Sequence, residues 1–121
     1  EAARLLETSV ADIQNDRFAA ALALAERFDA VVILKGHGSL VAGPGASAAV
    51  CSHGNPAMAS AGMGDALTGI VASLLGQGLT PYDAACCGVL VHALAGDRAA
   101  RGRRQILAGD LIDELARVLP A

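Results

Sequence analysis

The chain has 121 residues, of which 54% are hydrophobic and 17% are charged, and its formal net charge is -3. This composition is typical of one globular domain with a core, and it excludes an intrinsically disordered chain. The acidic balance and the scarcity of aromatic residues exclude nucleic acid as an expected partner, and no apolar run approaches the roughly 20 residues of a membrane span.

The N-terminal part of the sequence predicts one helix followed by strands. Apolar side chains at positions 18, 22, 25 and 28 recur at helical spacing, so we expect an amphipathic helix over residues 16–28 with these side chains on its apolar face. The segment AVVILK, residues 30–35, is continuously apolar, which predicts a strand covered on both faces, as in an α/β sheet. Short strands over 39–43 and 48–52 are expected to pair across the turn-rich segment GPGAS.

From residue 64 onward the pattern predicts helices. The first of them, which begins at Asp65, is apolar almost all round, and this predicts a buried helix packed on a sheet. Thr80 and Pro81 are typical of the start of the next helix. Three strands are few for the sheet that such helices cover, so we expect an incomplete part of a larger domain. The expected helices span 65–76 or 65–78, 81–100 and 109–119, with a solvated basic loop at 101–105.

The cysteines and histidines show no spacing typical of a metal site. His37 lies in a glycine-rich turn where it can touch a ligand, and His53 is expected on the surface of a loop. His92, in an apolar helix, is expected to be satisfied by a hydrogen bond to a neighbour. The chain shows no basic and apolar leader pattern, so we expect a cytoplasmic protein with buried, reduced thiols. These thiols belong to Cys51, Cys86 and Cys87.

The segment SAGMGDALTG, residues 60–69, places three glycines around one aspartate at a predicted helix start. Because the first turn of a helix has unpaired N–H groups, the amides of Gly62, Met63 and Gly64 are expected to form a phosphate cradle. Asp65 would lie beside the phosphate, where its carboxylate can accept a proton from a substrate hydroxyl that attacks phosphorus. The alternative is that Asp65 only caps its helix and the glycines only make a tight turn.

A second glycine-rich turn, LKGHGS at 34–39, follows the predicted strand. Ligands of α/β sheets bind beyond the carboxyl ends of strands, so Lys35 is expected to meet nucleotide phosphates or to line an adenine pocket. Gly36 and Gly38 permit close approach of the backbone to a ligand. The alternative is a surface lysine before a hairpin. In the later segment HGNPAMAS, Asn55 is expected to hydrogen-bond within its loop and to shape the approach to the glycine-aspartate turn.

Several segments resemble a known family. Residues 54–97, GNPAMASAGMGDALTGIVASLLGQGLTPYDAACCGVLVHALAGD, resemble the C-terminal signature of the ADP/ATP-dependent NAD(P)H-hydrate dehydratases, members of the ribokinase-like superfamily. VVILKGHGSLVAG resembles the preceding strand and nucleotide loop of that family, and EAARLLE resembles the helix before it. The resemblance covers nearly the whole chain. It implies an α/β fold with a layered sheet and flanking helices, in which residues 1–121 form the C-terminal portion of the dehydratase domain.

This resemblance implies a lyase that repairs hydrated NADH and NADPH. In the family's reaction, ADP or ATP phosphorylates the hydroxyl added to the nicotinamide ring, and phosphate then leaves as ring conjugation is restored. Gly64 would touch the phosphate end of the nucleotide, while Asp65 would face the hydrated nicotinamide and serve as the base. Mg²⁺ is implied too, since it would relieve repulsion between Asp65 and the phosphates. The other implied nucleotide contacts are Lys35, Gly36, His37, Gly38 and Ser39.

The chain departs from the family in two respects. Met63 stands where the family usually has threonine, so a hydroxyl contact is lost while the backbone N–H remains. The family domain is also much longer, and its upstream half supplies much of the sheet and several substrate contacts. We therefore expect the 121 residues alone to bind nucleotide poorly. A homo-oligomer is expected, and many bacterial relatives carry an epimerase domain fused upstream.

Two other functions stay open at this point. A ribokinase-like kinase of a small alcohol or vitamin precursor would use the same aspartate but release a phosphorylated product. An inactive nucleotide-binding fragment, stabilised by oligomer contacts, would bind nucleotide without turnover. The GNP and LAGD segments favour the dehydratase over the kinase.

Overall fold

The computed structural model describes residues 1–119, and the contacts within the chain divide it into two compact units. Unit 1 is Glu1–Val50 and unit 2 is Cys51–Ala121. Each unit has its own cluster of buried apolar side chains. No helix among residues 1–119 combines the length and the apolar character that a membrane crossing requires.

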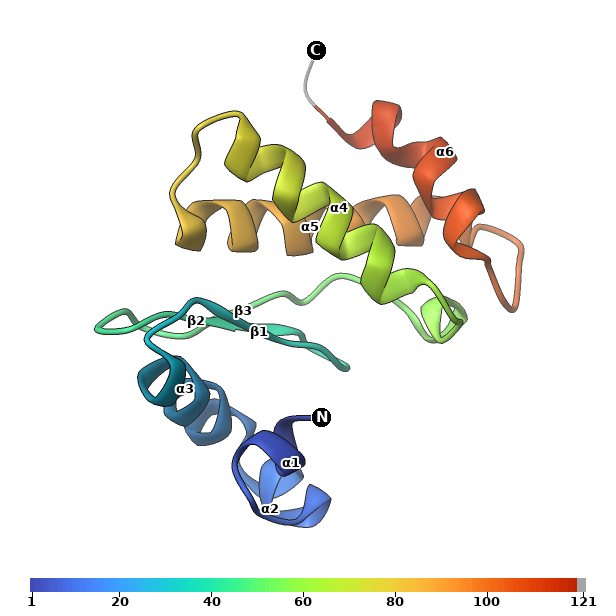
Figure 1. The fold of residues 1–121 in the computed structure, drawn as a ribbon. Coiled ribbons are helices and arrows are strands. Elements are labelled where there is room, and N and C mark those ends of the chain that lie inside the picture. The colour runs from blue at the N-terminus through green and yellow to red at the C-terminus, as the bar shows by residue number, and fades with distance from the viewer. Residues whose placement is uncertain (120–121) are drawn as a thin grey trace. The chain divides into compact units, whose positions relative to one another are not determined.

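Unit 1 packs one helix against a small antiparallel sheet, with α3 lying along one face of the sheet (Figure 1). The strands follow the order β1-β2-β3, and Val41 in the middle strand pairs with Ile33 on one side and Ala49 on the other. The predicted hairpin is therefore confirmed, with shorter strands. The elements are α1 (Ala2–Leu5), α2 (Val10–Asn15), α3 (Arg17–Phe28), β1 (Val32–Leu34), β2 (Leu40–Ala42) and β3 (Ala49–Val50).

Helix α3 confirms the predicted helix, but of the four predicted apolar positions only Ala25 is buried. The Asp16 side chain accepts a hydrogen bond from the backbone N–H of Ala19 at 2.9 Å and so caps the helix. Phe18 and Phe28, on the predicted apolar face, are each 49% exposed. The buried residues are the small ones and one leucine, because alanine side chains let a helix lie close to a sheet: Ala20, Ala21, Leu24 and Ala25.

The first strand is less covered than its sequence predicted. All three residues of β1 are half-buried, so the expectation of a strand covered on both faces is wrong within this unit. The reason is its place in the sheet, since β1 is an edge strand and only β2 is fully buried. Helix α2 was not predicted from its residues, although Ser9 and Asp12 form a capping box that marks its start.

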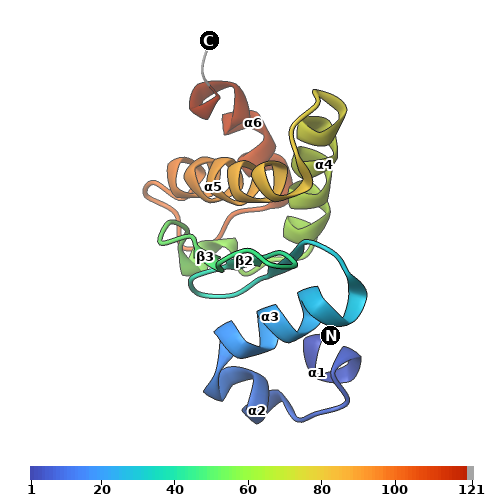
Figure 2. The same ribbon diagram turned by 90° about the vertical axis from the view of Figure 1, so that its left-hand side faces the viewer.

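Unit 2 is helical, and α5 is its centre. Helix α5 contacts both α4 and α6, as the two perpendicular views show (Figures 1 and 2). The core of unit 2 combines buried residues of α4, α5 and α6 with one residue of the segment before α6. These residues are Met63 in α4, Ala95 and Ala99 in α5, Leu111 in α6, and Ile106 before α6. The elements are the 3₁₀ helix η1 (Pro56–Met58), α4 (Met63–Gly76), α5 (Pro81–Ala99) and α6 (Ala108–Val118).

The three predicted helices of unit 2 are confirmed, but the burial predicted for α4 is not. The Thr80 side chain accepts from the Asp83 N–H at 3.2 Å and starts α5 as expected. In α4 only Met63 and Leu67 are buried. The helix presents one face to its partner helices of the unit, which leaves the other apolar side chains half-buried or exposed.

Candidate functional site

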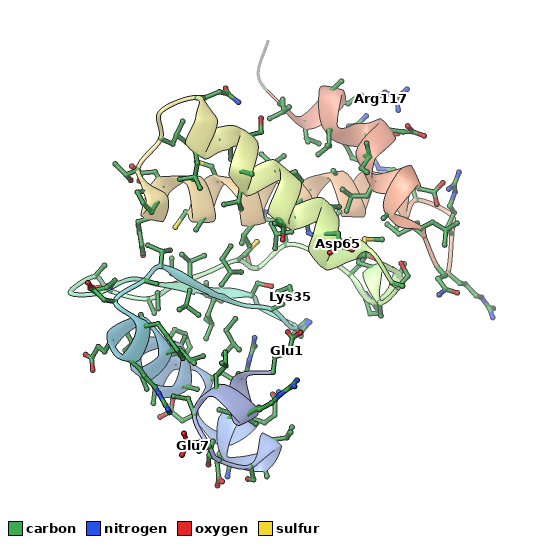
Figure 3. The ribbon with its side chains drawn as sticks, in the orientation of Figure 1. Glu1, Glu7, Lys35, Asp65 and Arg117 are labelled. Atoms are coloured by element: carbon green, nitrogen blue, oxygen red, sulfur yellow. The ribbon has the colours of Figure 1, made fainter. Side chains whose placement is uncertain are left out.

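The predicted nucleotide turn begins where β1 ends, and Lys35 extends from that end (Figure 3). Gly36 and Gly38 have φ values of 153° and 69°, in the region that favours glycine. The Ser39 hydroxyl closes the turn by donating to the Gly36 carbonyl at 3.3 Å. The five predicted residues therefore share one glycine-dependent turn, in which Lys35, Gly36 and His37 are exposed. Their contact with a nucleotide stays a prediction.

One residue that the sequence did not single out holds this turn. The Arg17 guanidinium donates through Nη1 to the carbonyl oxygens of His37 (2.6 Å) and Gly38 (3.1 Å), and through Nη2 to that of Leu34 (3.2 Å). Arg17 opens α3, 17 to 21 residues earlier in the chain. No local pattern marks such a contact, because an arginine at the start of an amphipathic helix is ordinarily a solvated residue.

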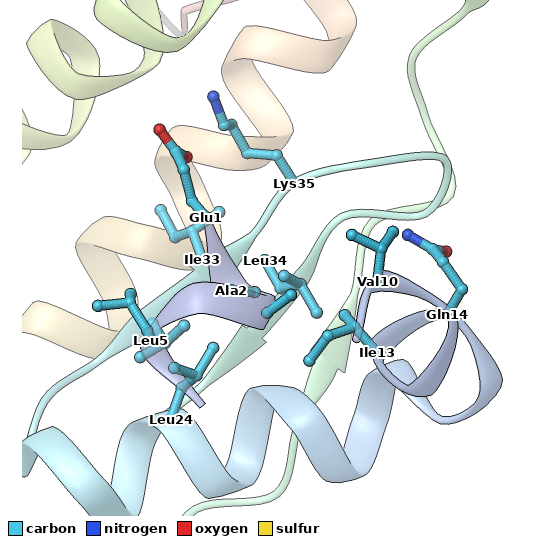
Figure 4. A pocket seen from close by; sticks show the side chains of 12 residues that line it. Glu1, Ala2, Leu5, Val10, Ile13, Gln14, Leu24, Ile33, Leu34 and Lys35 are labelled. Atoms are coloured by element: carbon cyan, nitrogen blue, oxygen red, sulfur yellow. The ribbon is translucent and has the colours of Figure 1, made fainter. Parts of the chain in front are cut away.

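A cavity of about 300 Å³ lies beside β1 within the same unit. Its wall comes from α1, α2, α3 and β1 and is largely aliphatic, while Glu1 and Lys35 bring their charged ends to the same side of it (Figure 4). The predicted nucleotide turn thus adjoins a concave surface that has an apolar wall and a charged rim.

In unit 2, the predicted phosphate cradle is the first turn of α4. Gly62 is the N-cap, with φ 85° and ψ -10°, and α4 has no side-chain hydrogen bond at its cap. Asp65 lies in the first turn and is exposed, so its carboxylate faces solvent at the positive end of the helix dipole (Figure 3). The alternative that Asp65 only caps the helix therefore finds no support in the hydrogen bonds of α4.

The start of α4 is fastened to α5. His92 Nε2 lies 3.0 Å from the carbonyl oxygen of Met63, which bears out the expectation that this histidine is satisfied by a neighbour. Met63 itself is 7% exposed and belongs to the core of unit 2. A Cβ at Gly62 would lie 3.3 Å from the Cβ of Ala108, so the turn is also packed against the start of α6.

The loop before this turn is organised by Asn55, as predicted, and by Asp97, to which the sequence pattern assigned no role. The Asn55 side chain accepts from the Ala57 N–H at 3.0 Å and donates to Asp97 Oδ1 at 2.7 Å. Asp97 also accepts from the Gly54 N–H at 3.1 Å, and His53 lies 3.7 Å from it while remaining half exposed. The GNP and LAGD segments that carry the family resemblance therefore meet in one hydrogen-bonded cluster.

The predicted basic loop borders a second, more open cavity of about 440 Å³. Its wall combines Asn55 and Asp97 with the side of the loop that carries three arginines, Arg101, Arg103 and Arg104. The loop is exposed, as expected, and Arg103 pairs with Asp110 at 2.7 Å.

All three cysteines are free thiols, but the expectation that they are buried is wrong. Cys51 and Cys86 are only partly buried and Cys87 is exposed. At about 100° per residue, the buried positions 84, 85, 88 and 89 of α5 share one side of the helix, and Cys86 and Cys87 lie on the other side. Burial nevertheless raises the pKa of the Cys86 thiol, which keeps it protonated at neutral pH.

Within residues 1–119 no three His, Cys, Asp or Glu side chains gather into a metal-binding group. At the predicted cradle, the carboxylate of Asp65 is the side chain that suits Mg²⁺. A single carboxylate is sufficient for such a site, because proteins commonly hold Mg²⁺ through one or two carboxylates together with substrate phosphates.

The structure thus gathers the predicted site residues into two groups. Residues 35–39 share the turn of unit 1, while Asn55 and residues 62–65 belong to the loop and helix start of unit 2.

Comparison with known proteins gives consistent matches over nearly the whole chain. The NAD(P)H-hydrate dehydratase family matches residues 1–119. The bifunctional NAD(P)H-hydrate repair enzyme of Escherichia coli is 50% identical over 98% of this chain, which spans 24% of that protein. The ADP-dependent (S)-NAD(P)H-hydrate dehydratase of Neisseria meningitidis is 47% identical over 96% of this chain, which spans 39% of it.

A solved structure shares the fold. The ADP/ATP-dependent NAD(P)H-hydrate dehydratase of Bacillus subtilis, co-crystallised with ATP and Mg²⁺, superposes with a TM-score of 0.89 at 29% identity. The match covers 96% of this chain and 43% of the Bacillus chain. The predicted fold class, part of a ribokinase-like α/β domain, is therefore confirmed. The chain spans less than half the length of each of these relatives.

Proposed function

The chain belongs to the NAD(P)H-hydrate dehydratase family, and we propose that it is the C-terminal portion of an enzyme that dehydrates hydrated NADH and NADPH at the expense of ADP or ATP. The observation that carries the proposal is the exposed carboxylate of Asp65 in the first turn of α4, directly after the left-handed Gly62. Both residues lie within the segment that matches the family.

We propose that residues of both glycine-rich turns contact the nucleotide. Residues 35–39 would contact the nucleotide from unit 1, with Lys35 supplying positive charge. In unit 2 the amides of Gly62, Met63 and Gly64 would receive the phosphate end, because the start of a helix presents N–H groups and partial positive charge to an anion. Met63 needs only its backbone for this role, since its side chain is buried in the core.

Asp65 would act as the general base. The hydroxyl of the hydrated nicotinamide ring attacks the terminal phosphorus of the nucleotide, and its proton passes to the carboxylate as the new O–P bond forms. The shortened nucleotide leaves with the electrons of the broken P–O bond. Elimination would then break the C–O bond to release phosphate, while the neighbouring ring carbon gives up a proton to water and the ring double bond is restored. The phosphorylation step turns hydroxide, a poor leaving group, into phosphate.

Mg²⁺ bound to the nucleotide phosphates would neutralise charge that otherwise repels the carboxylate. Asp65 is the residue at the cradle whose donor atoms fit such an ion. This chain's own part is to position the phosphates and to hold a proton acceptor beside them.

Two features support the proposal that residues 1–121 are part of a larger catalytic domain. The Bacillus relative is more than twice as long as the segment that this chain matches. In unit 1, Phe18 and Phe28 leave an apolar face of α3 about half exposed, and β1 is an edge strand. Additional chain of the parent protein would cover both, so we propose that the chain alone binds nucleotide poorly.

The proposal extends to the parent protein. Two of the names among its relatives, a bifunctional repair enzyme and a dehydratase, suit a domain that occurs both fused and alone. We propose a cytoplasmic homo-oligomer, with an epimerase domain upstream where the parent is of the bifunctional kind. Size-exclusion chromatography with light scattering measures the oligomeric state.

The experiment that tests the function is an absorbance assay at the NADH band, run on the full-length parent and on residues 1–121. Each receives hydrated NADH and Mg²⁺ with ADP, with ATP or with no nucleotide. Recovery of NADH only when a nucleotide is present would support the dehydratase and would reveal which nucleotide it prefers.

Other results would overturn parts of the proposal. Turnover by residues 1–121 alone would contradict an incomplete site. If neither protein restored NADH absorbance and the parent phosphorylated a small alcohol, the kinase would be favoured. Nucleotide binding by the parent without any turnover would favour an inactive nucleotide-binding protein.

A further inference from the structure

A single guanidinium holds the turn at residues 34–39 of unit 1. Arg17 donates hydrogen bonds to three carbonyl oxygens of this turn, at 2.6, 3.1 and 3.2 Å. Guanidinium donors diverge in a fixed plane, so one side chain can hold three acceptors only when the backbone curves around it. The turn is therefore shaped to fit Arg17.

The glycine at the centre of the turn is part of this fit. A Cβ at Gly36 would lie 2.8 Å from Arg17 Nη2, closer than a Cβ approaches another heavy atom, and 3.2 Å from its Cζ, which is a tight contact. The φ of 153° at Gly36 is also unfavourable for other residues. Gly36 thus leaves room for the guanidinium as well as for a ligand.

The contacts of the carbonyl groups determine where the amide groups point. All peptide bonds described are trans, and in a planar trans peptide the C=O and N–H point in opposite directions. The carbonyls of Leu34, His37 and Gly38 point toward the guanidinium. The N–H groups that share those peptide planes, of Lys35, Gly38 and Ser39, consequently point away from it.

Three amides directed away from one anchor are suited to acceptor atoms of a ligand. Successive N–H groups in a glycine-rich turn form a concave donor surface for phosphate and similar groups. Within residues 1–119 no carboxylate forms an ion pair with Arg17, so its positive charge adds to the field at the turn. An anion would meet fixed donors that need no reorganisation on binding.

We propose that Arg17 is the positioning residue of the nucleotide turn: by holding three carbonyls it orients the amides of Lys35, Gly38 and Ser39 toward the adenine nucleotide. The inference rests on the proposed function for the identity of the ligand. Arg17 acts through the backbone of the turn and does not touch the nucleotide. Lysine could not replace it, because an ammonium group at one point cannot span three acceptors in a plane.

The experiment compares variants of the full-length parent by calorimetric titration with ADP and Mg²⁺, and by steady-state kinetics. Arg17→Ala removes the anchor and Arg17→Lys keeps the charge without the planar fork. The matched control is Arg27→Ala, because Arg27 lies on the same helix and also forms a polar contact, with Glu7 at 2.9 Å, but does not touch the turn.

We expect Arg17→Ala to raise both the Kd and the KM for the nucleotide about tenfold or more, since hydrogen bonds from a charged group are lost. The kcat at saturating nucleotide should change far less, and Arg17→Lys should recover only part of the affinity. A merely structural role would lower the melting temperature and the active fraction without raising the nucleotide Kd selectively. Equal effects of Arg17→Ala and Arg27→Ala, or full recovery by Arg17→Lys, would overturn the proposal.

A second readout separates this proposal from the proposed function. Amide hydrogen exchange at residues 35–39 reports how firmly the turn is held, whether or not a nucleotide binds. Faster exchange in Arg17→Ala, combined with a wild-type parent that binds no nucleotide, would leave Arg17 as the anchor and overturn the nucleotide as its ligand. Unchanged exchange in a parent that does bind nucleotide would overturn the positioning role and leave the proposed function intact.

Discussion

The two glycine-rich turns of this protein are held in different ways. In unit 1 the turn at residues 34–39 is held by one charged side chain, Arg17, through three backbone carbonyls. In unit 2 the turn at 62–65 is the start of a long helix, and it is held by the packing of Met63 and by the contact of His92 with the Met63 carbonyl. The loop at residues 34–39 is positioned by one side chain, whereas the helix start at 62–65 is positioned mainly by the packing of its helix on the core of unit 2.

This difference suggests a division of labour. A turn held by one side chain can be weakened without unfolding its unit, and it suits the binding of a ligand. A turn built on a helix keeps a carboxylate in a constant place, which suits chemistry. The predictions below test whether binding and catalysis separate along this line.

The largest effect is expected at Asp65. Asp65→Asn in the full-length parent removes the proton acceptor while preserving the shape of the side chain, so kcat should fall by about 10² to 10⁴. Calorimetric titration should show that the nucleotide Kd is nearly unchanged, because the amides of the cradle remain.

The control is Asp83→Asn, which changes another aspartate in the first turn of a helix of unit 2. Asp83 accepts a hydrogen bond from the Thr80 hydroxyl at 2.7 Å, so its role belongs to the start of α5. Its kcat should stay close to that of the wild type. A loss of nucleotide affinity in Asp65→Asn as large as its loss of kcat would return Asp65 to a structural role.

The next effect is on the packing beneath the second turn. A Cβ at Gly88 in α5 would lie 2.6 Å from Cγ2 of Val71 in α4, and the β-branched valine has little freedom to move away. Gly88→Ala should therefore lower the free energy of unfolding by about 1–3 kcal/mol, as measured by urea denaturation.

Gly69→Ala is the matched comparison, because a Cβ at this helical glycine meets nothing within 4 Å. It should leave stability unchanged or raise it by up to about 1 kcal/mol, since alanine favours helix. If Gly88→Ala were as stable as Gly69→Ala, the helix start at residue 63 would not depend on the close packing of α4 and α5.

A smaller effect is expected from His92. Because a carbonyl only accepts hydrogen bonds, Nε2 of His92 carries the proton that is donated to Met63. His92→Leu should raise the nucleotide KM about threefold to tenfold, as one hydrogen bond that orients the cradle is lost. His92→Gln can offer an amide donor and should recover most of the affinity. Equal KM values for the two variants would show that the bond does not orient the cradle.

The sequence was sufficient to predict what is encoded locally. Both glycine turns, the helix start at Thr80 and Pro81 and the hairpin after residue 39 were predicted, because glycine, proline and capping residues act on their own neighbours. The long signature around Asp65 was specific enough to suggest the family. These are the parts of the fold and of the candidate site that need no knowledge of distant contacts.

The structural roles of Arg17 and Asp97 could not be predicted, because each of these residues binds partners far away along the chain. Arg17 reaches residues up to 21 positions away and Asp97 reaches residues 42 and 43 positions away. Most of the buried face of α3 was missed for a related reason, since periodicity favours the largest apolar residues while the sheet accommodates alanines. The only signal for Asp97 was its own position, as a charged residue directly after an apolar stretch within a predicted helix.

The smallest predicted effect is a change in thermal stability at acidic pH, and it tests whether the two turns depend on pH differently. A hydrogen bond from Arg98 at 3.0 Å, with help from Arg117, holds the pKa of the Glu114 carboxyl below its ordinary value of 4.5. A lowered folded-state pKa stabilises the fold above the ordinary value, and this stability is lost as the pH falls through the folded-state pKa. Glu114→Gln should therefore lower the melting temperature at neutral pH and converge with the wild type in acid.

Thermal unfolding followed from about pH 7 to about pH 3 measures this convergence, and Asp113→Asn, an exposed neighbour on α6, is the control that should show little of it. The hydrogen bonds from Arg17 to the turn at residues 34–39 should not depend on pH in this way, because their acceptors are carbonyl groups, which do not titrate. Amide exchange at residues 35–39 should accordingly show the same protection by Arg17 across this range. Protection that faded in step with the titration of Glu114 would mean that both turns depend on one support, and the division between them would fail.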